Sequence, residues 1–230
     1  MVKHMFLEDV NNLISDDKWL IFQNEYNTEV NPRYETLFTL TNGYMGVRGT
    51  FEEGSEGERS GNFIAGIFDK SDAQVREIVN AQNWLRIKLY VEGEELSLDK
   101  CQLIEFKRIL DMKKGILFRS MLIKDSKDRI TRIEGYRFIS RSNLHRSAIK
   151  LFVTPVNYSG VVGIESIIDG TVLNSADSPK YRVKHLKVAN NSSLSKNGVY
   201  LETATVDDDT RIATGSTVRI YHHEDEEKIT

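Results

Sequence analysis

The sequence has 230 residues, 40% apolar and 28% charged, which is typical of a soluble globular protein able to bury a core without disulfides or metals. Its net charge of −3, from 31 basic and 34 acidic residues, gives no reason to expect nucleic acid or an anionic membrane as a partner. Cys101 is the only cysteine, which excludes an internal disulfide framework and a cysteine-rich zinc site. We expect Cys101 to be a half-buried strand residue.

The first 20 residues predict neither a signal peptide nor a membrane span. They contain no basic region followed by an apolar block, and no run in the sequence approaches the roughly 18 apolar residues of a spanning helix. The protein is therefore predicted to be cytoplasmic. Phe6, Val10, Leu13 and Ile14 would share one helical stripe, but two asparagines interrupt it, so a helix and a loose leader both remain open.

Residues 35–54, ETLFTLTNGYMGVRGTFEEG, place three glycines close together behind an apolar run. Their spacing, G-x-x-G-x-x-G, matches neither a dinucleotide fingerprint nor a P-loop. The following segment, TFEEGSEGERSG, cannot start an amphipathic helix, and its four glutamates would repel a phosphate group. The sequence therefore excludes a phosphate-binding loop here.

The same stretch predicts a tight hairpin. Asn42 and Gly43 both tolerate positive φ, and Gly46 and Gly49 in the returning strand indicate a bulge or a close backbone approach. Arg48 lies between these two glycines and is expected to pair with a carboxylate of another element. The local sequence favours a packed hairpin with an ion-paired arginine over a functional site.

Strands with a period of two follow along most of the chain, joined by short polar connectors such as EGEE, KKG and DSKDR. They are predicted at residues 85–91, 148–153, 199–205 and 217–223. We therefore predict an all-β fold, a large antiparallel β super-sandwich of two packed sheets. The segment 69–79, DKSDAQVREIV, has room for one short helical turn.

No catalytic centre or metal site is assembled by sequence alone. The histidines are not spaced as metal ligands, and the acidic clusters Glu52-Glu53 and 207–209 are interpreted as solvated loops. Aromatic residues could stack against a sugar, although in a β-sandwich they more often belong to the core. The aromatic candidates are Tyr26, Tyr34, Tyr44, Trp84 and Tyr158.

Several segments together resemble the N-terminal domain of glycoside hydrolase family 65. They are ETLFTLTNGYMGVRGTFEEG, GNFIAGIFD, EIVNAQNWLRIKLYVEGEEL, ILDMKKGILFRS, ISRSNLHRSAIKLFVTPVNYSG and ESIIDGTVLN. They cover most of the chain in family order and spacing. The subgroup they resemble most contains disaccharide phosphorylases acting on kojibiose, nigerose, maltose or trehalose, and kojibiose is the first expectation.

The resemblance implies an architecture of four parts: a β super-sandwich, a helical linker, an (α/α)₆ barrel and a small C-terminal sheet. Residues 1–222 would be the sandwich domain, and residues 223–230 would start the linker to a barrel that this chain lacks. Asp225, Glu226 and Glu227 suit the first turn of such a linker helix, where carboxylates favour exposed N–H groups.

The resemblance also implies the reaction of the whole enzyme. Inorganic phosphate, the co-substrate, attacks the anomeric carbon of an α-linked glucosyl disaccharide with inversion and yields β-glucose 1-phosphate and a free sugar. A glutamate of the barrel acts as the general acid, so no catalytic residue falls within this chain, and no metal or organic cofactor is implied. A homodimer is expected.

Five residues are candidates for contacts with the barrel or for the mouth of its pocket: Asn42, Tyr44, Arg48, Asn83 and Trp84. Two other functions remain open. One is a free-standing carbohydrate-binding sandwich, which would need an exposed aromatic platform. The other is the same domain of a related hydrolase of the trehalase type.

Overall fold

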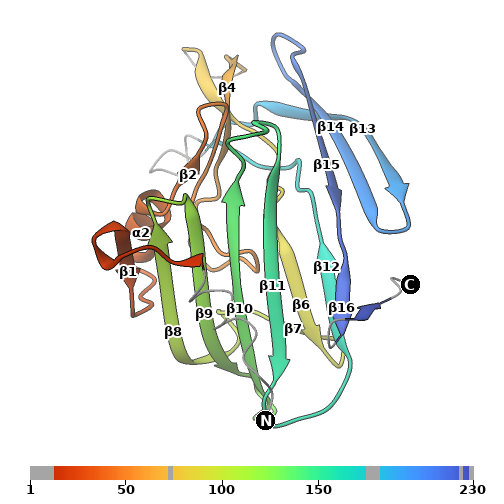
Figure 1. Ribbon diagram of the computed structural model, residues 1–230. Coiled ribbons are helices and arrows are strands. Elements are labelled where there is room, and N and C mark those ends of the chain that lie inside the picture. The colour runs from red at the N-terminus through yellow and green to blue at the C-terminus, as the bar shows by residue number, and fades with distance from the viewer. Residues whose placement is uncertain (1–12, 72–74, 175–181, 223–224, 228–230) are drawn as a thin grey trace. The chain divides into compact units, whose positions relative to one another are not determined.

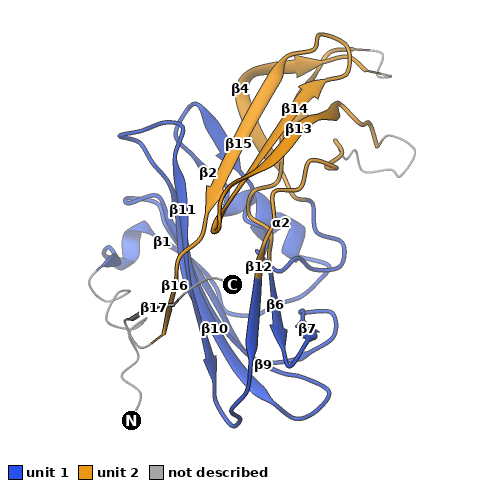
Figure 2. Ribbon diagram, turned by 90° about the vertical axis from the view of Figure 1, so that its right-hand side faces the viewer, with its two compact units in different colours: residues 1–59, 88–164 blue, residues 60–87, 165–230 orange. Residues whose placement is uncertain are grey.

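The computed structural model describes residues 13–71, 75–174, 182–222 and 225–227, and the chain forms two compact units (Figure 2). Unit 1 contains residues 1–59 and 88–164, and unit 2 contains residues 60–87 and 165–230. Nearly all regular structure consists of antiparallel strands (Figure 1), which confirms the predicted all-β sandwich class. The strands are divided among several smaller sheets rather than two large ones.

The large sheet of unit 1 has five strands in the order β1-β8-β9-β10-β11. They are β1 (Leu20–Gln23), β8 (Gln102–Asp111), β9 (Ile116–Lys124), β10 (Ile130–Ile139) and β11 (Ser147–Pro155). The segments predicted as turns, KKG and DSKDR, do connect β8 to β9 and β9 to β10. Because successive strands are hairpin neighbours, each inward-facing side chain lies beside a partner on the next strand.

A second sheet, ordered β12-β6-β7 and lying mostly in unit 1, faces the large sheet (Figure 2). Its strands are β6 (Ile87–Val91), β7 (Glu94–Leu96) and β12 (Val162–Ser166). Both sheets bury apolar side chains, among them Met121 and Ile133 in the large sheet and Leu89 and Val91 in β6. The alternation predicted for residues 85–91 is therefore confirmed.

The remaining elements of unit 1 precede its second sheet. They are the 3₁₀ turn η1 (Asp17–Trp19), helix α2 (Asn31–Leu37), and strands β2 (Leu40–Thr41) and β3 (Met45–Val47). The sequence did not predict α2, which is only two turns long and has Pro32 in its first turn, where a missing N–H is tolerated. Cys101 is half-buried as expected, but it precedes β8 instead of lying in a strand.

Unit 2 pairs β4 (Asn62–Asp69) with β5 (Glu77–Asn80). A three-stranded sheet contains β13 (Leu186–Ser195), β14 (Gly198–Thr205) and β15 (Arg211–Thr217), and β16 (Ile220–His222) pairs with β17 (Asp225–Glu227). The core of the unit is small and apolar. It consists of Val79, Ala81, Val172, Leu186 and Ile212, with Ile64 and Ile67 packed against it.

Two helix predictions differ from the structure. Residues 225–227 form β17, because their backbone groups pair with residues 220–222 instead of opening a helix. In the segment 69–79, residues 77–79 belong to β5, and residues 72–74 lie outside the described residues. The helical stripe predicted near the N-terminus also lies outside them, except for Leu13 and Ile14. No helix among the described residues is long and apolar enough to cross a membrane.

Candidate functional site

The glycine-rich stretch forms the β2–β3 hairpin, in which Leu40 pairs with Val47. Gly43 has a φ of +91°, whereas Asn42 is not among the residues with positive φ. The side chain of Asn42 shapes the turn instead, since its Oδ1 accepts hydrogen bonds from the N–H groups of Tyr44 (3.0 Å) and Met45 (2.9 Å). The predicted hairpin is confirmed, but only one of its two central residues uses the left-handed region.

Gly49 is the position where the backbone comes close to another element. Its N–H donates to the carbonyl of Glu35 at 2.7 Å, and a Cβ added at Gly49 would lie 2.6 Å from Cβ of Phe38. Gly46 has room to spare, because the nearest atoms to an added Cβ lie 3.8 Å away in Thr41. The predicted close approach therefore occurs at Gly49, where α2 packs directly against the chain leaving β3.

Arg48 turns toward α2. Its guanidinium donates to Oγ1 of Thr36 (2.9 Å) and to the carbonyl of Pro32 (3.2 Å), and it pairs with Glu35 (3.4 Å). The predicted ion pair with another element is thus present, as a single contact rather than a fork. These bonds tie the end of β3 to the helix.

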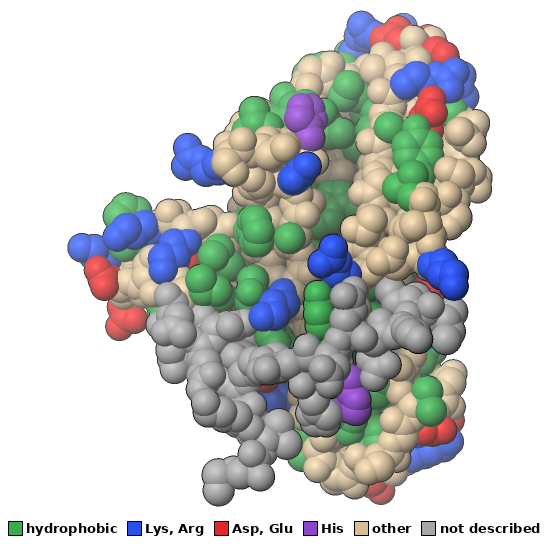
Figure 3. Space-filling model, turned by 45° about the vertical axis from the view of Figure 1, so that its right-hand side comes forward, with side chains coloured by type: hydrophobic (Ala, Val, Ile, Leu, Met, Phe, Trp, Pro, Cys, Tyr) green, Lys and Arg blue, Asp and Glu red, His purple; other side chains and the backbone are tan. Residues whose placement is uncertain are grey.

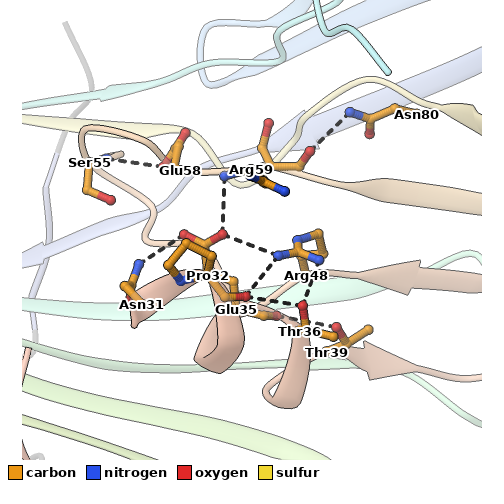
Figure 4. Close-up of polar contacts among 12 residues, drawn as sticks. Asn31, Pro32, Glu35, Thr36, Thr39, Arg48, Ser55, Glu58, Arg59 and Asn80 are labelled. Atoms are coloured by element: carbon orange, nitrogen blue, oxygen red, sulfur yellow. Dashed lines mark hydrogen bonds and ion pairs between the residues drawn. The ribbon is translucent and has the colours of Figure 1, made fainter. Parts of the chain in front are cut away.

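Glu35 is the centre of this arrangement and is fully buried (Figure 4). Its carboxylate accepts hydrogen bonds from Nδ2 of Asn31 (2.9 Å), from Arg48, and from the backbone N–H of Arg59 (3.1 Å). A buried carboxylate is costly unless it is paired and hydrogen-bonded, and Glu35 meets both conditions. It therefore joins α2 to Arg48 and Arg59, which lie before and after residues 49–53 in the chain.

Three buried arginines of the large sheet hold residues 49–53, which we call the signature loop. Arg108 of β8 donates to Oε1 of Gln23 (2.8 Å), to Oδ1 of Asn31 (2.9 Å) and to the carbonyl of Gly49. Its guanidinium carbon also lies 4.3 Å from the ring centre of Phe51. Such stacking over an aromatic face is favourable for a desolvated cation.

Arg119 of β9 and Arg137 of β10 bind the two glutamates of the loop. Arg119 makes a bidentate pair with Glu53, with both N–O distances 2.6 Å, and its Nε lies 3.0 Å from Glu52. Arg137 donates to Glu52 (2.7 Å) and to the carbonyls of Thr50 (2.8 Å) and Arg48 (3.0 Å). The loop is fixed through both its side chains and its backbone.

Strand register explains why the arginines meet. Arg108 lies opposite Gln23 on one side and Arg119 on the other, and Gly135 lies opposite Arg119. Arg137 follows Gly135 by two residues and so shares its face. The face that is apolar near Met121 is therefore polar near the signature loop.

Protonation in this cluster reflects both burial and charge. Burial, followed by repulsion from Arg137, lowers the pKa of Arg108 to about 9. Burial also acts to lower the pKa of Arg119, but Glu52 and Glu53 outweigh it and raise the pKa. For Glu52, burial acts to raise the pKa, and the charges of Arg119 and Arg137 outweigh it and lower the pKa.

This geometry corrects the interpretation of the acidic pair Glu52 and Glu53 as solvated. Their exposed fractions are 3% and 7%, and buried arginines neutralise both. By contrast, residues 207–209 are exposed, as predicted. A cavity of about 10 Å³ lies beside Thr50, Arg119 and Arg137, which is no more than one water molecule needs. The cluster thus has no room for a sugar or a phosphate group.

Other candidate features are structural as well. Tyr26 packs edge-on against buried Phe51 at a centroid distance of 5.7 Å, and Tyr34 packs against buried Phe38 at 5.5 Å, so both tyrosines are half-buried at the edge of the core. Among the described residues, no three His, Cys, Asp or Glu side chains are placed to hold a metal ion. On the face drawn in Figure 3, basic side chains are scattered rather than gathered in one band.

The five predicted contact residues fall into two groups. Asn42, Tyr44 and Arg48 belong to unit 1, and Asn83 and Trp84 belong to unit 2. Asn83 is buried, exchanges backbone hydrogen bonds with Asp169, and accepts a bond from the N–H of Leu85 (3.0 Å). Trp84 is half-buried. A role of these residues in contacting a barrel stays a prediction.

Sequence reasoning missed the three arginines that organise the site. Each interrupts an apolar alternation, as Arg108 does between Phe106 and Leu110, and Arg119 between Leu117 and Met121. An arginine in step with core positions of a strand is a usable signal of a buried ion pair. Asn31 and Glu35 had no such signal, because α2 itself was not predicted.

The family model described as "Glycosyl hydrolase family 65, N-terminal domain" matches residues 21–230. This match includes the signature loop, its three arginines and nearly every strand of both units. The chain therefore belongs to glycosyl hydrolase family 65, as that family's N-terminal domain, and the resemblance expected from the sequence is confirmed.

Two relatives resemble the chain over nearly its whole length. The chain is 95% identical over 228 residues to a kojibiose phosphorylase of Thermoanaerobacter brockii, covering 99% of this chain and 29% of that protein. It is 67% identical over 219 residues to a kojibiose phosphorylase of Caldanaerobacter subterraneus, covering 95% and 28%. The chain thus spans less than a third of these relatives.

A solved structure agrees on the fold. A human-microbiome protein provisionally assigned as a kojibiose phosphorylase superposes with a TM-score of 0.74 at 20% identity. The superposition covers 88% of this chain and 27% of that one. At this identity the likeness concerns the fold alone.

Proposed function

We propose that the chain is the non-catalytic N-terminal domain of an inverting disaccharide phosphorylase that converts kojibiose and inorganic phosphate into β-glucose 1-phosphate and glucose. In this reaction a phosphate oxygen bonds to the anomeric carbon as the glycosidic C–O bond breaks. A carboxylic acid outside these 230 residues protonates the departing sugar oxygen. The observation that carries the proposal is the 95% identity to a kojibiose phosphorylase.

The substrate follows from the order of the similarities. Kojibiose phosphorylases match at 95%, 67% and 36% identity, and a trehalose and a maltose phosphorylase match at 35% and 34%. The buried signature supports a structural role for the domain, because Glu52 and Glu53 are already paired with arginines. The homodimer and the cytoplasmic location stay predictions.

The test is phosphate-dependent breakdown of kojibiose, nigerose, maltose and trehalose by the full-length enzyme beside the 230-residue chain. We expect glucose 1-phosphate from kojibiose with the full-length enzyme alone. Turnover by the 230 residues would refute the non-catalytic role. Breakdown without phosphate would favour a hydrolase, and binding of sugar without breakdown would favour a carbohydrate-binding module.

A further inference from the structure

Two loops of unit 1 are held together at one end of the large sheet. They are the β2–β3 turn, residues 42–44, and the β10–β11 connection, residues 140–146, which we call the paired loops. Nδ2 of Asn42 donates to the carbonyls of Ser140 (2.7 Å) and Leu144 (3.0 Å). The rings of Tyr44 and His145 lie 4.2 Å apart, centre to centre. The two loops therefore present one surface.

The longer loop has a defined shape because its own polar groups bond to one another. The N–H of Asn143 donates to Oγ of Ser140 (3.0 Å), and the N–H of His145 donates to Oδ1 of Asn143 (3.2 Å). Backbone bonds join the N–H of Ser140 to the carbonyl of Arg146 (2.9 Å), and the N–H of Arg146 to the carbonyl of Asn143 (3.1 Å). The exposed side chains are thus carried on a fixed frame.

The surface is basic and partly apolar. All residues from 141 to 146 are exposed, including Leu144 at 43%. The sequence has no Asp or Glu at residues 39–48 or 139–150, although the chain as a whole is acidic. Within the described part of the chain, no ion pair involves Arg141 or Arg146. Exposed Arg76 and Arg211, by comparison, both meet carboxylates.

We infer that the paired loops dock against an acidic surface of the catalytic portion of the same polypeptide. Arginines and aromatic rings around an apolar centre are the groups that dominate protein interfaces, and Arg141, Arg146, Tyr44 and Leu144 supply them. The occupant is the remainder of the polypeptide, because relatives at 95% and 67% identity carry more than twice this length in addition. This inference rests on the proposed function.

A zero-length crosslink tests the contact. In the full-length enzyme, R141K and R146K each place an amine at the surface, and a carbodiimide joins amines to carboxylates only where they touch. Mixing ¹⁴N- and ¹⁵N-labelled enzyme separates links within one chain from links between copies. We expect links within one chain to carboxylates beyond residue 230. Links between copies, links confined to residues 1–230, or no links would each overturn the inference.

Charge reversal provides an independent readout. R141E/R146E in the full-length enzyme should speed proteolytic cleavage between this domain and the rest by roughly tenfold, which corresponds to a loss of about 1.4 kcal/mol from the docked state. K113E/K196E is the matched control, with the same change of charge on two other exposed turns. Equal cleavage rates in both variants would contradict the inference. Phosphorolysis by the unaltered enzyme tests the proposed function separately, so either can fail alone.

Discussion

Arg119 shows at the scale of single residues how the signature loop is held. It is buried, and its guanidinium contacts Glu53 through two nitrogens and Glu52 through a third. A buried ion pair contributes little more to stability than apolar side chains in place of both partners would. Removing only one partner, however, leaves the other charge buried without a counter-ion. Single substitutions in this cluster should therefore be far more damaging than their exposed counterparts.

Arg119→Ala should lower the free energy of unfolding by about 3–5 kcal/mol, because Glu53 would remain buried without its counter-ion. Arg211→Ala is the control, since Arg211 pairs with Asp209 and Glu202 at the surface and should change stability little. Urea denaturation of both variants decides the point. If both variants lost the same free energy of unfolding, burial of the Arg119 ion pair would not make its disruption more destabilising.

Glu52 makes the stability of the domain depend on pH. Its pKa is lowered in the folded state from an ordinary value of 4.5, since Arg119 and Arg137 outweigh the opposing effect of burial. A lowered carboxyl pKa contributes stability above the unfolded value and loses it as the pH falls through the folded value. We therefore expect the urea concentration at the unfolding midpoint to decrease as the pH is lowered beneath 4.5. The decrease should be less steep in Glu52→Gln. Parallel curves would contradict this assignment.

At the scale of elements, α2 and the signature loop form one packed body. Gly49 allows their backbones to touch, and Arg48 donates hydrogen bonds to Pro32 near the start of the helix and to Thr36 near its end. Glu35 of the helix accepts hydrogen bonds from Arg48, before the loop, and from Arg59, after it. A two-turn helix is too short to be stable by itself. Its conformation therefore depends on these contacts.

Gly49→Ala should destabilise the domain by about 1–3 kcal/mol, as overpacking in a tight interior does. The added Cβ would lie 2.6 Å from Phe38, so α2 would have to move. Gly46→Ala, three residues earlier in β3 and with 3.8 Å of clearance to Thr41, is the matched control and should cost much less. Thermal denaturation distinguishes the two, and similar melting temperatures would mean that α2 shifts at no cost.

At the scale of the whole molecule, patterns of period two predicted the fold class and several strands, because alternating burial leaves a local trace. Residues 85–91, 148–153 and 199–205 fall in or beside β6, β11 and β14. Residues 217–223 were predicted as one strand but span the end of β15 and all of β16. The hairpin at Asn42 and Gly43 was also predictable from two residues.

The contacts that define the site were not predictable in this way. Gly49 and its donor Arg108 are 59 residues apart, and Arg119 and Glu53 are 66 apart. Glu52 and Glu53 have the composition of a solvated loop, and only the register of β8, β9 and β10 brings arginines over them. Local sequence can predict a single strand or turn, whereas these contacts between distant residues depend on how the strands pair in the sheet.

The central claim is that the family signature in this domain holds structure and performs no chemistry. Glu53→Gln in the full-length enzyme tests it most directly, with kcat for kojibiose phosphorolysis and the melting temperature measured on the same sample. We predict a lower melting temperature and an unchanged kcat well below it, because within the described residues the Glu53 carboxylate pairs with Arg119 alone. A fall in kcat of about 100-fold or more, as loss of a general acid causes, at an unchanged melting temperature would contradict the account.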